Sequence, residues 1–105
     1  MFIADLVDQV KANLILTHDE DDQLIESLVG AATSYATAYQ HLPEHYYEHE
    51  PMSGVTRQAI VLLATHFYES RDGATAGFWS DKPEAARAVW SAVNNLLRLD
   101  REWKL

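Results

Sequence analysis

A continuous apolar run stands in the middle of this 105-residue chain, Ala59-Ile60-Val61-Leu62-Leu63-Ala64. It leads into the mixed segment His66-Phe67-Tyr68-Glu69-Ser70-Arg71. A helix that is apolar nearly all round must be covered by other helices or by a neighbouring subunit, because water on any face would meet hydrocarbon. We therefore expect a central helix here. We further expect that a single copy cannot cover both this helix and the aromatic residues of the loops. Identical copies would then close into a ring.

The segment before it is apolar on one side only. Its spacing places a stripe along a helix, made of Leu24, Ile25, Leu28, Val29, Ala32, Tyr35, Ala36 and Tyr39. At the start, Thr17-His18-Asp19-Glu20 has the form of a capping box, whose side chains satisfy open backbone amides. Asp19 to Asp22 would then lie in the first turn, which favours carboxylates. The pattern predicts an amphipathic helix over about 18–40 that covers the core from one side.

The remaining segments predict a single all-α domain, 1–105, of four helices and two long loops. A short helix is expected over about 4–13, and the central helix over about 55–71, ended by Asp72-Gly73. Pro83 and the apolar stripe after it predict a fourth helix over about 83–99. The loops cover about 41–54, with at most one helical turn, and 72–80. A basic and aromatic tail follows, from Arg98 to Leu105.

Charge is unevenly distributed. The net charge is −8, but residues 1–56 carry ten acidic residues and the single base Lys11, whereas residues 57–105 carry seven bases and six acids. The chain lacks the clustered bases that hold nucleic acid, and its asymmetry favours head-to-tail contact between copies. Cysteine is absent, which excludes disulfides and thiolate metal sites. The first residues lack a signal-peptide pattern, and no run approaches the ~20 residues of a membrane span, so we expect a soluble protein.

Two strings are more specific than the amphipathic background: the acidic helix start before Leu24-Ile25 and the helix end His66 to Arg71. The further matching residues are Val10 to Leu16, Ala31-Ala32, Ala59 to Leu63, Leu96-Leu97 and Arg101. In this combination, over nearly its whole length, the chain resembles the small head-to-tail connector proteins of long-tailed bacteriophages.

The resemblance implies a structural role, with no catalysis and no cofactor. It implies a ring of about twelve copies that docks beneath the portal protein after DNA packaging. DNA would pass through the lumen without specific binding, and the next tail-side connector or stopper protein would join the other rim. The implied location is the virion, at the head-tail junction, and the host cytoplasm during assembly.

A ring requires a heterologous interface, in which one patch meets a different patch on the next copy. Complementary charge sets orientation and encounter rate, and exposed ion pairs add only ~0–1 kcal/mol each, so apolar area must supply the affinity. We expect the tail or a loop to grip the portal, and truncation after Arg98 to leave a folded protein that no longer docks. The candidate interface residues are Tyr46, Tyr47, Glu69, Arg71, Phe78, Trp79, Arg98, Arg101 and Trp103.

Histidines suggest one alternative, a metal-dependent hydrolase. His41, His45 and His49 are spaced by four, and His45-Tyr46-Tyr47-Glu48-His49 has the form of the inverted zinc-protease motif, which needs two imidazoles on one helical face. Two prolines bracket this short segment, so we favour a polar loop that presents tyrosines. The run Asp19 to Asp22 lacks the glycine and the final glutamate of an EF-hand. His66 fits a hydrogen-bonded core or interface residue better than a ligand.

The other alternative is a small acidic regulatory or interaction protein, including a mimic of nucleic acid. Such a protein would be a monomer or a dimer. Mass measurement at several concentrations separates it from a ring-forming subunit.

Overall fold

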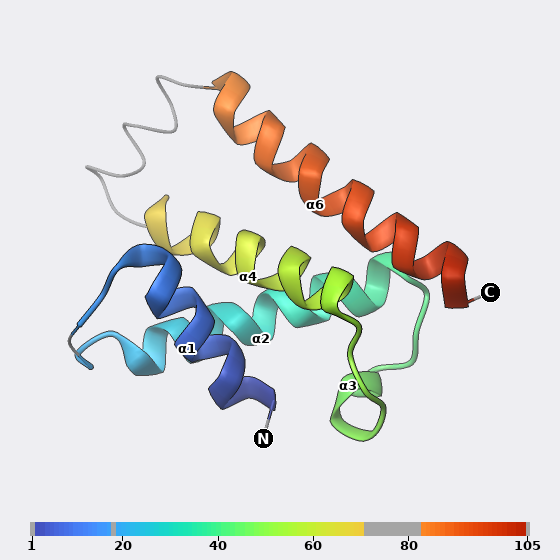
Figure 1. The fold of residues 1–105 in the computed structure, drawn as a ribbon, viewed down its shortest axis with the longest axis horizontal. Coiled ribbons are helices and arrows are strands. Elements are labelled where there is room, and N and C mark those ends of the chain that lie inside the picture. The colour runs from blue at the N-terminus through green and yellow to red at the C-terminus, as the bar shows by residue number, and fades with distance from the viewer. Residues whose placement is uncertain (1, 18, 71–82, 105) are drawn as a thin grey trace.

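The computed structural model describes residues 2–17, 19–70 and 83–104, and for residues 2, 83–85 and 101–104 it describes the backbone alone. The elements are α1 (Phe2–Leu14), α2 (Asp22–Tyr39), α3 (Tyr46–His49), α4 (Gly54–Glu69) and α6 (Pro83–Lys104) (Figure 1). No strand occurs among the described residues. The predicted all-α class is confirmed.

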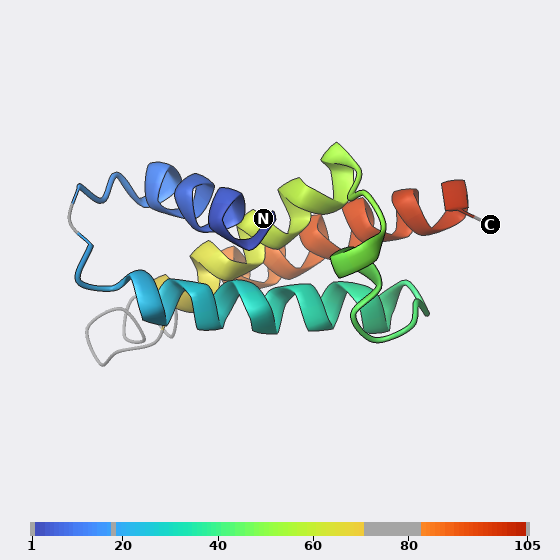
Figure 2. The ribbon, with the colours of Figure 1, turned by 90° about the horizontal axis from the view of Figure 1, so that it is seen from below.

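Helix α4 is the centre of the fold. It packs against α1, α2 and α6; Figure 1 shows α1 and α6 on opposite sides of it, and Figure 2 shows α2 running along a further side of the bundle. Five residues of the apolar run are at most 3% exposed: Ala59, Ile60, Val61, Leu63 and Ala64. Burying each of the larger aliphatic side chains stabilises the fold by about 1.5–3 kcal/mol. The prediction of a central helix is confirmed.

One copy of the chain is sufficient to cover this helix. The partly buried Leu62, Phe67 and Tyr68 also pack against the same core. The expectation that neighbouring copies must shield the apolar run is therefore wrong, because α1, α2 and α6 already exclude water from it. The core by itself does not require a ring.

The surrounding helices follow their apolar spacing. Leu6 and Val10 of α1 are fully buried, as are Ile25, Val29 and Ala32 of α2. From α6, Val93 and Leu97 enter the same cluster, and the predicted core residue Trp90 packs against it while partly buried. The one-sided character predicted for the long second helix is thus confirmed.

The start of α2 differs from the sequence prediction. The helix begins at Asp22, after Asp21 at the N-cap, rather than near residue 18, and the Asp21 side chain makes no capping bond. The predicted capping box of Thr17 and Glu20 does not form at this helix start, and only Asp22 lies in the first turn. The acidic run instead stabilises the connection between α1 and α2, because Lys11 forms ion pairs with Asp19 and Asp22.

The later boundaries shift by a few residues. Helix α4 begins after Ser53, whose hydroxyl accepts a bond from the Thr56 amide at 3.1 Å, and ends at Glu69, two residues before the predicted end. Asp72-Gly73, the predicted terminator, lies outside the described residues. Helix α3 is the single turn expected in the first loop. Helix α6 continues to Lys104, so the predicted separate tail is a helical extension.

Helix α1 ends in a strained turn. The Leu16 amide donates to the Lys11 carbonyl oxygen at 2.9 Å, and the Ile15 amide to that of Ala12 at 3.2 Å. These two bonds form a Schellman cap, in which glycine normally takes the left-handed position. Here Ile15 takes it, with a φ of 58°, although a β-branched side chain is disfavoured there. Because Ile15 is 84% exposed, packing within the chain does not offset the strain.

We expect Ile15→Gly to raise the free energy of unfolding by about 1 kcal/mol, because glycine adopts this backbone without a Cβ clash and no buried contact is lost. Urea unfolding measures the change. The control Ile15→Ala keeps a Cβ and should recover little of the gain. Equal gains from both variants would show that backbone strain is not the cause.

Candidate interaction surfaces

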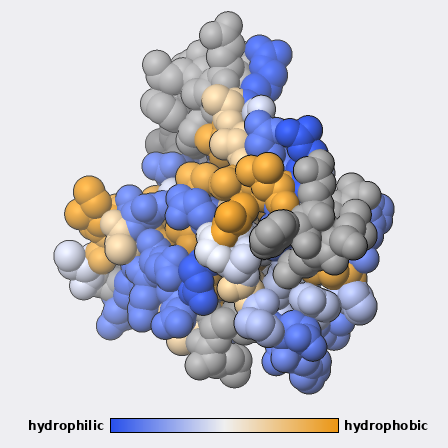
Figure 3. Space-filling model, turned by 45° about the vertical axis from the view of Figure 1, so that its right-hand side comes forward, coloured by the Kyte–Doolittle hydropathy of each residue, from blue (hydrophilic) through white to orange (hydrophobic). Residues whose placement is uncertain are grey.

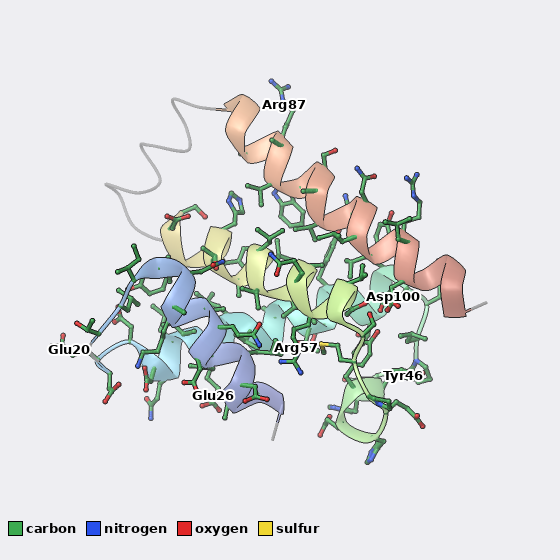
Figure 4. The ribbon with its side chains drawn as sticks, in the orientation of Figure 1. Glu20, Glu26, Tyr46, Arg57, Arg87 and Asp100 are labelled. Carbon is green, nitrogen blue, oxygen red and sulfur yellow. The ribbon has the colours of Figure 1, made fainter. Side chains whose placement is uncertain are left out.

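The exposed acidic side chains of α1 and α2 and the exposed basic side chains of α6 lie on opposite sides of the molecule, whereas the half-buried Arg57 of α4 lies on the side of Glu26 (Figure 4). Asp5 and Asp8 of α1 and Glu26 of α2 are exposed, as are Arg87 and Arg98 of α6. Figure 4 shows Glu20 and Glu26 on the side of α1 and α2, whereas Arg87 projects away from the bundle. Helix α4 lies between the two sides. The charge asymmetry of the sequence thus becomes an acidic face on α1 and α2, and a basic face on α6.

The one base of the acidic half is held inside a local ion cluster. Lys11 Nζ lies 2.7 Å from an oxygen of Asp19 and 2.8 Å from one of Asp22. Hydrogen bonds to these two carboxylates raise the pKa of Lys11, so it stays charged at neutral pH. The cluster joins the end of α1 to the start of α2. It also leaves Asp5, Asp8 and Glu26 to set the sign of the acidic face.

The outer face of α6 is a second surface. Its members recur at helical spacing and are exposed: Arg87, Ala88, Ser91, Ala92, Asn95, Arg98 and Leu99. Leu99 is 56% exposed and adds apolar area to this face. Figure 3 shows, on one side of the molecule, hydrophobic surface lying between hydrophilic areas. Ala88, Ala92 and Leu99 give the α6 face apolar area, and Arg87 and Arg98 give it positive charge.

A groove of about 570 Å³ opens between α1, α2 and the loop that carries α3. Ile3 lines it from α1, and Glu44 to Glu48 line it from the loop and α3. The remaining wall is one side of α2 with its small residues, followed by Leu42; these are Gly30, Thr33, Ser34, Thr37 and Ala38. The groove therefore has a smooth helical wall and a rim with two carboxylates.

A buried polar network holds the α3 loop and the end of α6 to the bundle. The Tyr47 hydroxyl donates to Gln40 Oε1 at 2.7 Å, and Gln40 Nε2 donates to Thr56 Oγ1 at 2.9 Å. Thr56 in turn donates to an Asp100 carboxylate oxygen at 2.5 Å. All four side chains are at most 4% exposed. Burial raises the pKa of Tyr47, so its hydroxyl remains a donor at neutral pH.

Sequence reasoning missed Gln40, Thr56 and Asp100 because polar residues near helix ends ordinarily face water. A signal was present in their spacing. Asp100 stands three residues after the buried Leu97, and Gln40 four residues after the buried Ala36, so both continue an apolar stripe.

An aromatic cluster joins α2, α4 and α6. The Trp90 ring lies edge-on to Tyr35, His66 and Phe67, with centroid distances of 5.4, 6.1 and 6.1 Å. The Tyr35 hydroxyl donates to Asn94 Oδ1 at 2.6 Å. His66 is 8% exposed, and this burial lowers its pKa below the usual 6.5. The expectation that His66 lies in the core agrees with its position.

Comparison with protein families matches residues 4–82 to the model of the phage gp6-like head-tail connector protein. The match covers well over half of the chain. The protein belongs to the phage gp6-like head-tail connector family. It is therefore a structural protein of the phage virion at the head-tail junction. Searches of curated proteins and of solved structures gave no match.

Of the nine predicted interface residues of this connector, the structure describes the side chains of Tyr46, Tyr47, Glu69 and Arg98, and these four lie in different regions. Tyr46 is half-buried against Tyr47, with ring centroids 5.1 Å apart, and Tyr47 is buried in the polar network. Glu69 is exposed at the carboxy-terminal end of α4. Because α4 has 16 residues, Glu69 lies ~24 Å from the start of this helix, which is the end nearer to α3. Arg98 is exposed on α6 and makes a long hydrogen bond of 3.4 Å to Asn95.

The structure does not describe the side chains of the remaining five predicted residues. Arg71, Phe78 and Trp79 lie outside the described residues, and Arg101 and Trp103 lie on the α6 backbone with side chains outside the description. Tyr46, Glu69 and Arg98 therefore do not form one patch. Because the single chain already buries Tyr47, we leave it out of the proposed contact surface.

The histidine loop of the connector does not form the helical face that the zinc-protease motif needs. His45 precedes α3 with a left-handed φ of 63°, and its Nδ1 contacts the Glu48 carboxylate. Only His49 of the two motif histidines lies on the helix. No three potential metal ligands gather among the described residues. In the same part of the chain, no helix combines the length and apolar character of a membrane span.

We expect Tyr47→Phe to lower the free energy of unfolding by about 1–3 kcal/mol, because the buried Gln40 carbonyl oxygen loses its donor. Chemical denaturation measures it. Tyr39→Phe is the matched control, since the half-buried Tyr39 has no hydroxyl hydrogen bond within the described part of the chain. A loss no larger than that of the control would contradict the role of the network.

Stability should fall as the pH drops below 6.5, the usual pKa of histidine, because the unfolded chain then binds a proton at His66 that the folded chain does not. Denaturation between neutral pH and about pH 5.5 tests this before carboxylates titrate. His66→Gln should flatten the dependence, whereas His49→Gln, at an exposed site, should retain it. An unchanged slope in the His66 variant would refute the assignment.

Proposed function

We propose that this connector subunit closes head-to-tail into a ring of about twelve copies that docks beneath the portal and extends the DNA channel. The observation that carries the proposal is the separation of two unlike faces by α4. The acidic face of α1 and α2 and the basic face of α6 lie on opposite sides of that helix. Membership of the head-tail connector family supports the same role.

Opposite placement of the two faces suits a closed ring. A contact between different patches repeats from copy to copy, and it closes if each step turns the next copy by a constant angle. Patches on opposite sides allow the small turn that a ring of many copies requires. The opposite charges then orient each encounter, which changes the association rate more than the affinity.

Affinity in this arrangement comes from apolar area. A stable protein interface buries about 800 Å² on each partner. Ala88, Ala92 and Leu99 on the α6 face provide exposed apolar surface, and Ile15 provides more at the α1–α2 turn. The core contributes none of this area, since the single chain already buries α4.

The two ends of the long axis supply the contacts along the channel. Helix α6 has 22 residues and spans ~33 Å, and its carboxy-terminal end lies at one end of the long axis of the molecule (Figure 1). We assign its carboxy-terminal end, with Arg101 and Trp103, to the portal. We assign Glu69, at the carboxy-terminal end of α4, to the next tail-side connector or stopper protein.

Truncation after Arg98 is no longer a clean test of the portal contact. It would delete Asp100, which accepts the Thr56 hydrogen bond in the buried network. Loss of that carboxylate leaves buried donors without an acceptor and lowers stability. Truncation after Arg101 retains Asp100 and removes Trp103, and is the preferred variant.

DNA passes such a ring without specific binding. The net charge of −8 repels phosphate, and the described bases are dispersed rather than clustered. An acidic lumen would let the duplex slide. In this arrangement one edge of the acidic face borders the lumen, with Asp5 and Asp8 near it.

The test is to mix the protein with the cognate portal, image the complex and measure mass by light scattering at several concentrations. Wild type should form a ring on the portal. Arg87→Glu should weaken lateral association by roughly fivefold, corresponding to ~1 kcal/mol. A matched variant that also carries Asp8→Arg and Glu26→Arg should regain association, because the carboxylate introduced on α6 then faces positive charge on α1 and α2.

Absence of any ring, with and without portal, would reject the proposal. A stable monomer that binds neither portal nor itself would favour the small acidic interaction protein. Equal weakening in the single and the compensated variants would exclude the charged faces as the lateral contact.

A further inference from the structure

We propose that the groove between α1, α2 and α3 receives the end of α6, around Leu99 and Arg98, from the neighbouring copy. The proposal rests on the head-to-tail ring and identifies which surface meets which.

The groove is a suitable shape for a helix end. Its volume of about 570 Å³ is open to solvent, and its wall along α2 is made of small side chains. Small residues on one helix allow a second helix to approach closely, because no long side chain stands between the two backbones. Ser34 and Ala38 on this wall are exposed, so the single chain leaves that surface uncovered.

Gly30 has no role that the single chain explains. It lies in the interior of α2, where glycine is less favourable than alanine because it loses more conformational freedom on folding. Its backbone is not left-handed, and a Cβ built on it would meet nothing within 4 Å. A methyl group at this position would face the groove without touching the rest of the fold. The smallness of Gly30 is therefore explained by an approaching partner.

The rim of the groove is acidic. Glu44 and Glu48 both line it, with side chains 89% and 53% exposed. His45 lies between them and contacts both carboxylates. An occupant that carries a positive charge beside an apolar group would match this rim and wall.

The end of α6 has that chemistry. Arg98 is exposed beside Leu99, itself 56% exposed, and the described part of the chain covers neither. This part of α6 belongs to the basic face, on the far side of α4 from the groove. A copy displaced along the intermediate, 31 Å dimension of the molecule, which is vertical in Figure 1, would bring its Leu99 to the α2 wall. Its Arg98 would then stand near Glu44 and Glu48, while Arg87 would approach the acidic face.

The first test fills the groove. Gly30→Leu should fold with an unchanged or higher melting temperature, and its self-association should weaken at least tenfold in sedimentation. The matched control is Ala31→Leu, at an exposed neighbouring position of α2 that does not line the groove. It should associate like wild type. Normal ring formation by Gly30→Leu would overturn the proposal.

The second test uses the absence of cysteine from the chain. Ser34→Cys places a thiol on the groove wall, and Asn95→Cys places one on α6, one turn before Leu99. The two single variants are mixed under conditions in which wild type forms rings, with portal if required, and treated with a short bismaleimide. The expected product is the mixed pair, with little product from either variant alone.

The outcomes separate this proposal from the proposed function. Rings that form without the mixed crosslink would overturn the groove contact and leave the ring intact. A chain that never associates, with or without portal, would reject both. Selective loss of association in Gly30→Leu together with the mixed crosslink supports the groove as the lateral contact.

Discussion

The exclusion of water from the middle of α4 is the constraint on which this structure depends. Ile60, Leu63 and Ala64 are at most 1% exposed, and no face of the helix between them is polar enough to be left open. Three helices are needed to surround such a rod, and α1, α2 and α6 each contribute one apolar stripe. The stripes fix how the three helices are turned, and therefore which of their side chains face outward.

The outward sides of the helices determine which contacts the protein can make as a connector. With the stripes of α1 and α2 turned inward, their acidic residues form one face, and the same constraint turns Arg87 and Arg98 of α6 to the opposite side. A molecule with unlike opposite faces is prepared for heterologous contact. Family membership places it at the head-tail junction of a phage, where such contacts are useful.

The buried network at one end of the bundle gives the groove its shape. Gln40 and Thr56 link the end of α2 to the start of α4, and Tyr47 and Asp100 attach the α3 loop and α6 to the same point. Buried hydrogen bonds of this kind contribute modestly when formed but are costly to break. The loop that forms one wall of the groove is therefore held in place by polar contacts rather than by apolar packing alone.

The sequence by itself determined the helical class, the central position of residues 59–64 and the separation of charge, because apolar spacing and charge order depend only on the order of residues along the chain. It did not determine that Tyr47 would be buried, that Asp100 would lie inside, or that Lys11 would form ion pairs with Asp19 and Asp22. These outcomes depend on residues 7 to 60 positions apart meeting in space. Only the tertiary structure decided that one copy suffices to cover α4, since the area that three helices can cover follows from their packing and not from any local pattern.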